Sequence, residues 1–188
     1  MPEHLIGVHL NMLFPQPPGE VTDLTEQEQA RLEALRRFRA EGAAYGAIQS
    51  TRPQTVAYGL TDSPAGQLAW ITEKFGEWTD NGLPDEAVGR DQLLTNVSLY
   101  WLTATAGSSA RLYYEAAHSG GWGPPAVSAV PTGVAVFPRE IAPPIRRFAE
   151  LSNNIAHWSE FDRGGHFAAM EVPDLLTGDI RQFFRQFR

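Results

Sequence analysis

The sequence contains no cysteine, which excludes disulfide bonds, a thiolate nucleophile and a metal site built on cysteine sulfur. Such a chain suits a reducing compartment, and we expect a cytoplasmic protein. Basic residues are also few: 15 lysines and arginines stand against 22 aspartates and glutamates, a formal net charge of -7. Because this balance offers little attraction for phosphate groups, we expect no nucleic acid among the partners.

Long apolar runs are absent as well. No stretch approaches the roughly 20 apolar residues that a membrane-spanning helix needs, so we expect no membrane span. Four of the five histidines show no metal-ligand spacing with one another or with carboxylates, and we expect them to be surface residues or hydrogen-bonded core residues. These four are His4, His9, His118 and His157. We therefore expect neither a metal site nor a cofactor.

Strand and helix patterns alternate along the chain. Short apolar runs between polar or turn residues predict buried strands at 5–10, 127–137 and 154–158. Thr25 and Glu28 have the spacing of a capping box, ahead of a helix that should run to about Arg39. Further helices are predicted at about 63–78 and 91–114, from 143 onward, and at 173–187. Strands separated by helices predict an α/β fold with a parallel sheet.

Two residues in the last third of the chain carry the clearest chemical signal. His166 lies among small residues at a predicted strand-to-helix junction, and Glu140 follows the predicted strand at 127–137. An imidazole that accepts a proton during a reaction needs a carboxylate at its second ring nitrogen, which fixes the tautomer and stabilises the imidazolium. We therefore expect the carboxylate of Glu140 to bind the Nδ1 side of His166. No glycine-flanked turn that could carry a nucleophile precedes them.

Several short motifs occur in an order and at spacings that make the chain recognisable. They are Gln49-Ser50-Thr51-Arg52-Pro53-Gln54-Thr55, Asp62-Ser63-Pro64-Ala65-Gly66, Glu73-Lys74-Phe75, Leu94-Thr95-Asn96-Val97, Tyr100-Trp101, Ser108-Ser109, Phe137-Pro138-Arg139-Glu140 and Gly164-Gly165-His166-Phe167-Ala168-Ala169. Together they resemble the microsomal-type epoxide hydrolases of the α/β-hydrolase superfamily. The resemblance covers nearly the whole chain and is to the C-terminal half of that family only.

This resemblance implies a partial α/β-hydrolase fold, made of the C-terminal strands of a mostly parallel sheet with a helical lid insertion. Residues 1–20 correspond to a core strand, residues 21–120 to a mainly helical lid, and residues 121–188 to the C-terminal core with the acid and the histidine. The half that carries the oxyanion loop and the aspartate nucleophile is expected to lie outside this chain. A strand edge left bare in this way favours the N-terminal half, or self-association, as a partner.

The family's site residues can be placed on this sequence one by one. Glu140 corresponds to the charge-relay acid and His166 to the general base, while Tyr45 and Tyr113 correspond to two lid tyrosines that donate hydrogen bonds to the epoxide oxygen. A phenol can donate to the developing alkoxide without competing as a strong nucleophile. The two hydroxyls should therefore lie within about 6 Å of each other and face His166. The substrates implied are a small lipophilic epoxide and water.

Other functions stay open at this stage. The chain could be a noncatalytic remnant or a binding module that keeps the lid pocket. A dehalogenase or an esterase of the same superfamily fits less well, because a dehalogenase has no use for the tyrosine pair and an esterase needs a serine elbow. Asp62 invites interpretation as a nucleophile, but Asp62-Ser63-Pro64 is more simply the cap of the helix that begins there.

Overall fold

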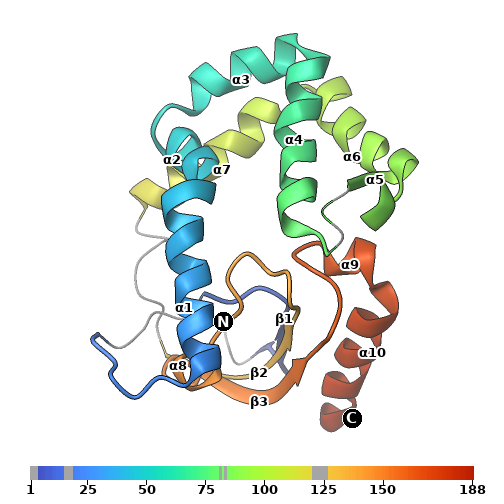
Figure 1. The fold of residues 1–188 in the computed structure, drawn as a ribbon. Helices are drawn as coiled ribbons and strands as arrows, with labels where there is room; N and C mark the ends of the chain where they lie inside the picture. The colour runs from blue at the N-terminus through green and yellow to red at the C-terminus, as the bar shows by residue number, and fades with distance from the viewer. Residues whose placement is uncertain (1–3, 15–18, 81, 83, 120–126) are drawn as a thin grey trace. The chain divides into compact units, whose positions relative to one another are not determined.

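The computed structural model of the 188-residue chain describes residues 4–14, 19–80, 82, 84–119 and 127–188 (Figure 1). The chain divides into two compact units. The sheet unit comprises Met1–Phe38, Trp78–Asp80 and Pro124–Arg188, and the helical unit comprises Arg39–Glu77 and Asn81–Gly123. None of the helices formed by the described residues combines the length and the apolar character needed to cross a membrane.

The sheet has three parallel strands in the order β1 (Val8–Leu10), β2 (Ser128–Val136) and β3 (Asn153–Glu160). The predicted α/β class and parallel sheet are confirmed. In the central strand β2, every residue from Thr132 to Val136 is buried. This is the pattern of a strand that is covered on both faces. The strand expected at 5–10 is shorter than predicted, because only its last three residues pair with β2 and the side chains of Leu5 and Ile6 are exposed.

Two helices cover opposite faces of this sheet. Ser159 of β3 hydrogen-bonds to Asp179 in α10 (Pro173–Phe184), whereas Glu160 binds Arg31 in α1 (Glu26–Arg37). Because successive side chains of a strand point to opposite faces, α10 and α1 lie on different sides of the sheet. The short helices α8 (Arg146–Ala149) and α9 (Ala168–Glu171) and the terminal 3-10 turn η3 (Arg185–Phe187) complete this unit.

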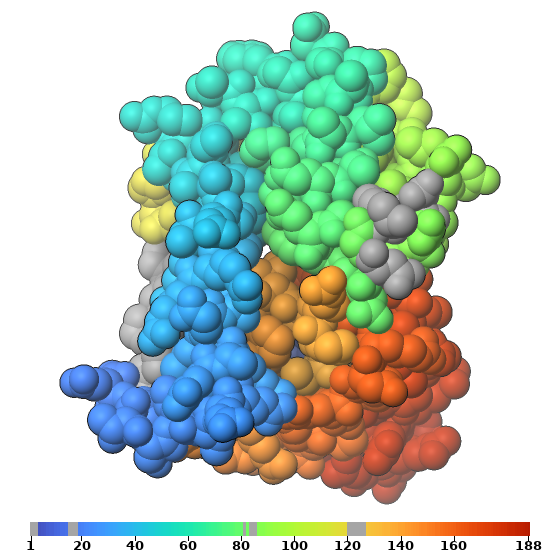
Figure 2. Space-filling view, in the orientation of Figure 1, coloured from blue at the N-terminus to red at the C-terminus, as the bar shows by residue number. Residues whose placement is uncertain are grey.

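The capping box predicted at the start of α1 is confirmed. The backbone N–H of Glu28 donates to Oγ1 of Thr25 at 3.2 Å, and the N–H of Thr25 donates to the carboxylate of Glu28 at 2.9 Å. The helix ends at Arg37, close to the predicted end, and continues as a π-helical turn, η2 (Phe38–Gly42). None of the residues of α1 is buried, and the helix lies on the surface of the sheet unit (Figure 2).

Helix α10 packs on the sheet at Gly133 of the central strand β2. His9 of β1, Gly133 of β2 and His157 of β3 are neighbours across the sheet. A Cβ atom at Gly133 would lie 2.9 Å from the ring of Phe183 in α10, so only glycine leaves room for this aromatic ring. Both histidines hydrogen-bond to the carboxylate of Asp179, which confirms the expectation of satisfied core histidines.

The two remaining histidines of that group lie on the surface. His4 and His118 are exposed, and Nδ1 of His118 lies 2.7 Å from the carbonyl oxygen of Tyr114. In the part of the chain that the structure describes, no group of three or more histidine, aspartate or glutamate side chains is arranged to hold a metal ion.

The helical unit contains α2 (Ala44–Thr51), α3 (Pro53–Asp62), α4 (Pro64–Trp78), α5 (Pro84–Ala87), α6 (Arg90–Leu102) and α7 (Ala106–His118). Trp78, the last residue of α4, groups with the sheet unit. Helices α2 and α3 both pack against α7. Small buried residues, Ala57 on α3 and Ala106 and Ala110 on α7, allow a close approach of these helices.

One sequence-based expectation in the helical unit is wrong. The single helix expected at 91–114 is two helices, because Ala104 adopts a left-handed φ of 54° and the Thr103 hydroxyl donates to the Leu99 carbonyl oxygen where α6 ends. The cap expected at Asp62-Ser63-Pro64 is confirmed: the hydroxyl of Ser63 accepts the N–H of Gly66 at 3.0 Å, while Asp62 is the last residue of α3.

Candidate active site

Glu140 and His166 lie together at the end of the sheet. Nδ1 of His166 is 2.7 Å from Oε1 of Glu140, as predicted from the sequence. An isolated parallel bridge between Arg139 and Gly165 brings the two loops side by side. The Glu140 side chain is only 1% exposed, whereas the His166 side chain is 20% exposed. The pair therefore has a buried carboxylate and an imidazole that reaches the surface of the sheet unit.

The hydrogen bonds of this pair define what the imidazole can do. Oε1 of Glu140 also accepts the backbone N–H of Ile141 at 2.8 Å. Oε2 is buried and accepts no hydrogen bond from the residues that the structure describes. An acceptor at Nδ1 favours the tautomer with the proton on that nitrogen, which leaves the Nε2 lone pair of His166 able to accept a proton. The pair can therefore act as a general base.

The loop that carries His166 requires glycine at two successive positions. Gly164 has φ of +98°, and a Cβ atom there would lie 2.6 Å from the side chain of Val172. A Cβ atom at Gly165 would lie 2.3 Å from the carbonyl oxygen of Trp78. No other residue fits this approach without moving the backbone. The glycine run read from the sequence thus corresponds to a tight loop packed on another segment.

Aromatic rings flank the imidazole. The ring of Trp78 lies edge-on to His166, with centroids 5.2 Å apart, and the ring of Phe167 lies edge-on at 5.0 Å. The backbone N–H of His166 donates to the carbonyl oxygen of Trp78 at 2.9 Å. The contact with Trp78 was not predicted, because no local sequence pattern connects residues so distant along the chain. Trp78 and Phe167 restrict the orientation of the imidazole.

The two tyrosines lie together in the helical unit. The rings of Tyr45 on α2 and Tyr113 on α7 are 5.9 Å apart and edge to face. Burial raises the pKa of Tyr45 to about 12, and both the charge of Tyr113 and a hydrogen bond with Tyr113 contribute to this rise. The Nζ atom of Lys74 is 4.8 Å from the centre of the Tyr45 ring. The structure thus pairs the tyrosines, while their convergence on His166 stays a prediction.

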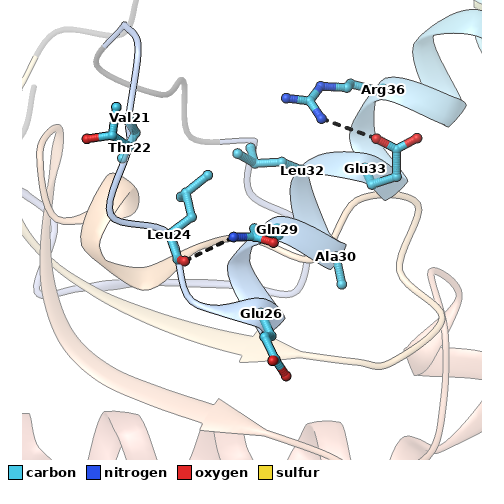
Figure 3. Close-up of a pocket in the computed structure, with 9 residues that line it drawn as sticks. All are labelled: Val21, Thr22, Leu24, Glu26, Gln29, Ala30, Leu32, Glu33 and Arg36. Atoms are coloured by element: carbon cyan, nitrogen blue, oxygen red, sulfur yellow. Dashed lines mark hydrogen bonds and ion pairs between the residues drawn. The ribbon is translucent and has the colours of Figure 1, made fainter.

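A groove of about 580 Å³ lies elsewhere in the sheet unit, along α1 and the segment that precedes it (Figure 3). Polar and charged residues contribute much of its lining, including an ion pair between Arg36 and Glu33 at 3.2 Å. Gln29 also donates to the carbonyl oxygen of Leu24 across the groove. None of the predicted site residues lines this groove, so it is not the candidate active site.

Comparisons with known proteins agree with the sequence-based resemblance. No family model matches the chain. The chain is 49% identical over 191 residues to a putative epoxide hydrolase of Stigmatella aurantiaca, covering 100% of this chain and 43% of that protein. It is 36% identical over 213 residues to epoxide hydrolase 1 of Sus scrofa, covering 97% of this chain and 46% of that protein.

Solved structures give the same result. The juvenile hormone epoxide hydrolase of Bombyx mori matches with a TM-score of 0.86 and 31% identity, over 100% of this chain and 50% of that one. The epoxide hydrolase of Aspergillus niger matches with a TM-score of 0.81 and 33% identity, over 96% of this chain and 46% of that one. This chain spans about half the length of the relatives it matches. From the sequence motifs, the parallel sheet and these similarities, we conclude that the chain belongs to the epoxide hydrolases of the α/β-hydrolase superfamily.

Proposed function

We propose that this chain supplies the charge-relay acid, the general base and the lid tyrosines of an epoxide hydrolase. The observation that carries the proposal is the 2.7 Å hydrogen bond between Nδ1 of His166 and the buried carboxylate of Glu140. Membership of the epoxide hydrolase family gives this pair its chemical context. The substrate we propose is a small lipophilic epoxide, and the co-substrate is water.

The reaction has two steps. In the first, an aspartate carboxylate attacks a carbon of the epoxide, the C–O bond of the ring breaks, and an alkoxide develops on the ring oxygen. We assign this aspartate to a segment outside these 188 residues, which is supported by the share of the relatives' length that the chain covers. The hydroxyls of Tyr45 and Tyr113 donate hydrogen bonds to the developing alkoxide.

In the second step, Nε2 of His166 takes a proton from water, and the resulting hydroxide adds to the carbonyl carbon of the ester. The ester C–O bond then breaks and leaves a carboxylic acid on the enzyme. The two alkoxide oxygens of the product take up one proton from the imidazolium and one from this acid, which releases the diol and restores the aspartate. Glu140 stabilises the imidazolium while it exists. The net change is epoxide plus water to vicinal diol.

The chemistry of Tyr45 supports its proposed part. A phenol whose pKa is about 12 keeps its proton at neutral pH, so that it remains a hydrogen-bond donor throughout the reaction. The neighbouring hydroxyl of Tyr113 offers a second donor close by. A pair of phenols suits an oxygen that gains negative charge, and it favours an epoxide over the halide of a dehalogenase.

The remaining assignments are also part of this proposal. We assign residues 1–20 and 121–188 to the hydrolase core and residues 21–120 to the lid. The partner that completes the core is the N-terminal half of the hydrolase, and the compartment is the cytoplasm. The competing function is that of a binding module which keeps the lid but has no covalent chemistry.

Turnover of styrene oxide by a completed enzyme tests the proposal. We expect no measurable turnover by the purified 188-residue chain, and turnover when a separately made N-terminal half of an epoxide hydrolase is added. In that complex, His166→Gln should lower kcat by several orders of magnitude. His118→Gln is the matched control, because His118 is exposed and should leave the rate unchanged.

Two outcomes would contradict the proposal. Turnover by the isolated chain would show that its nucleophile lies within these residues and would direct attention to Asp23, Asp62 and Asp162. A complex that forms and binds the epoxide, but never releases diol, would instead support the binding module.

A further inference from the structure

The segment Trp78–Asp80 accepts hydrogen bonds from backbone N–H groups of the loop that carries His166. The N–H of His166 donates to the carbonyl oxygen of Trp78 at 2.9 Å, and the N–H of Gly164 donates to Oδ2 of Asp80 at 3.0 Å. Both contacts lie within the sheet unit. Alternate N–H groups of the loop are thus bound by this one distant segment.

The other two N–H groups of the loop are bound by one side chain, Glu171 at the end of α9. The N–H of Phe167 donates to Oε1 of Glu171 at 3.1 Å, and the N–H of Gly165 also hydrogen-bonds to this carboxylate. Oε2 of Glu171 accepts the N–H of Asp80 at 2.8 Å. A single carboxylate therefore binds both neighbours of His166 and the segment that binds His166 itself.

We propose that Glu171 is a positioning residue for His166. By accepting the N–H groups of Gly165 and Phe167, its carboxylate fixes the backbone on both sides of His166, and with it the direction of the imidazole. A hydrogen bond of 2.7 Å to the buried carboxylate of Glu140 tolerates little displacement of the ring. The inference rests on the proposed function, in which His166 is the general base.

The chemistry of the side chain explains why this residue is a glutamate. An ionised carboxylate accepts hydrogen bonds and donates none, so it matches three N–H donors. A glutamine of the same shape has only one acceptor oxygen, and its amide would direct N–H groups at backbone N–H groups. An aspartate is one methylene shorter and cannot span the same donors.

The surroundings of Glu171 disfavour the ionised form of its carboxylate. Burial raises the pKa of Glu171, and hydrogen bonds from the backbone of Asp80, Phe167 and Gly165 offset part of that effect. The charge of Asp80 raises the pKa further. A partly buried acid next to a second acid is unfavourable unless several donors compensate for it. The three backbone donors provide that compensation.

Proton exchange at the imidazole of His166 tests this inference in the intact chain. With ¹⁵N-labelled histidine, NMR reports the tautomer of His166 and the exchange rate of its Nδ1–H proton with water. In Glu171→Gln we expect exchange at least about tenfold faster, the effect of losing roughly one charge-assisted hydrogen bond, together with a mixture of tautomers. Glu150→Gln is the matched control, because Glu150, directly after α8, is exposed and pairs with Arg146. It should leave the rate within twofold of wild type.

A second control separates positioning from general loss of stability. Val130→Ala removes buried volume near the far end of β2 and destabilises the sheet unit without touching the His166 loop. If Val130→Ala accelerates the exchange as much as Glu171→Gln does, global opening explains the effect and the inference is wrong. Exchange in Glu171→Gln within twofold of wild type would equally overturn it.

A shorter acid covers the case in which Glu171→Gln does not fold. Glu171→Asp keeps the charge, but its side chain is too short to reach all three N–H donors. Its exchange rate should therefore lie between those of wild type and Glu171→Gln. If Glu171→Gln does not fold, the rate in Glu171→Asp should still be above that of wild type. A wild-type rate in Glu171→Asp would overturn the inference. These measurements need no turnover, so an inactive complex that keeps the Glu171 effect would reject the proposed function and leave the positioning of His166 intact.

Discussion

His9 and His157 share one carboxylate across the sheet, that of Asp179 in α10. Nε2 of His9 lies 2.7 Å from Oδ2 of Asp179, and Nε2 of His157 lies 2.7 Å from Oδ1. The hydroxyl of Ser159 donates to Oδ1 at 2.6 Å. The Asp179 side chain is only 3% exposed. Because these partners belong to β1, β3 and α10, the carboxylate joins both outer strands to the helix that covers them.

Removing this carboxylate should destabilise the fold. Asp179→Ala leaves the buried imidazoles and the Ser159 hydroxyl without their acceptor, and we expect the free energy of unfolding to fall by about 3 kcal/mol. Urea denaturation followed by circular dichroism measures this. Asp174→Ala on the same helix is the control, because Asp174 is exposed and pairs with exposed Arg163, and its loss should cost less than about 1 kcal/mol. Equal costs for the two variants would contradict the structural role of Asp179.

The same carboxylate should make stability depend on acidity. Burial by itself raises the pKa of Asp179, but the hydrogen bonds from Ser159, His157 and His9 outweigh it, and the pKa is lowered overall. A lowered pKa in the folded state means that the stabilisation is complete above the unfolded value of about 3.9 and is lost as pH falls through the folded pKa. We therefore expect a steeper loss of stability below about pH 4 in wild type than in Asp179→Asn. Parallel slopes of unfolding free energy against pH would contradict this.

The elements that sequence patterns predicted best are those with strong local signals. The apolar run that became β2, the capping box at Thr25 and the proline at the start of α10 each depend on neighbours a few residues away. Helices α2 and α3 were not predicted, because neither begins with a side-chain cap and each has a glycine in its interior, Gly46 in α2 and Gly59 in α3. Their packing against α7 depends on tertiary contacts that no local window contains.

The candidate site divides in the same way. The Glu140–His166 hydrogen bond was predicted, since both residues follow strands that end at the same edge of a parallel sheet. The roles of Trp78 and Glu171 were not, because their partners are backbone N–H groups that any sequence offers. The glycines at 164 and 165 were the only local sign that another segment approaches this loop closely.

An alanine substitution at Gly165 can be compared with one at Gly178, where a Cβ atom would have space. Gly165→Ala places a Cβ atom 2.3 Å from the Trp78 carbonyl oxygen, so the loop must move. We expect a loss of about 3 kcal/mol and disappearance of the slowly exchanging Nδ1–H proton of His166. Gly178→Ala is the control, because nothing lies within 4 Å of a Cβ atom at this position in α10. That change should stabilise the protein by about 0.5–1 kcal/mol. Thermal unfolding and histidine NMR measure both effects, and a Gly165→Ala variant as stable as wild type would contradict the observed approach.

The ionisation of Tyr45 reports the tyrosine pair directly. Burial is the main cause of its raised pKa of about 12, and the charge and hydrogen bond of Tyr113 add to it. Tyr113→Phe removes the second contribution and leaves most of the first, so we expect the pKa of Tyr45 to fall but to stay above the ordinary tyrosine value of about 10. The ¹³C shift of the Tyr45 ring carbon that bears the hydroxyl, followed from pH 9 to the highest pH at which the fold survives, measures this. Because the variant is isosteric apart from one oxygen, an unchanged titration would mean that the two hydroxyls do not interact. The pair could then not direct two donors at one epoxide oxygen.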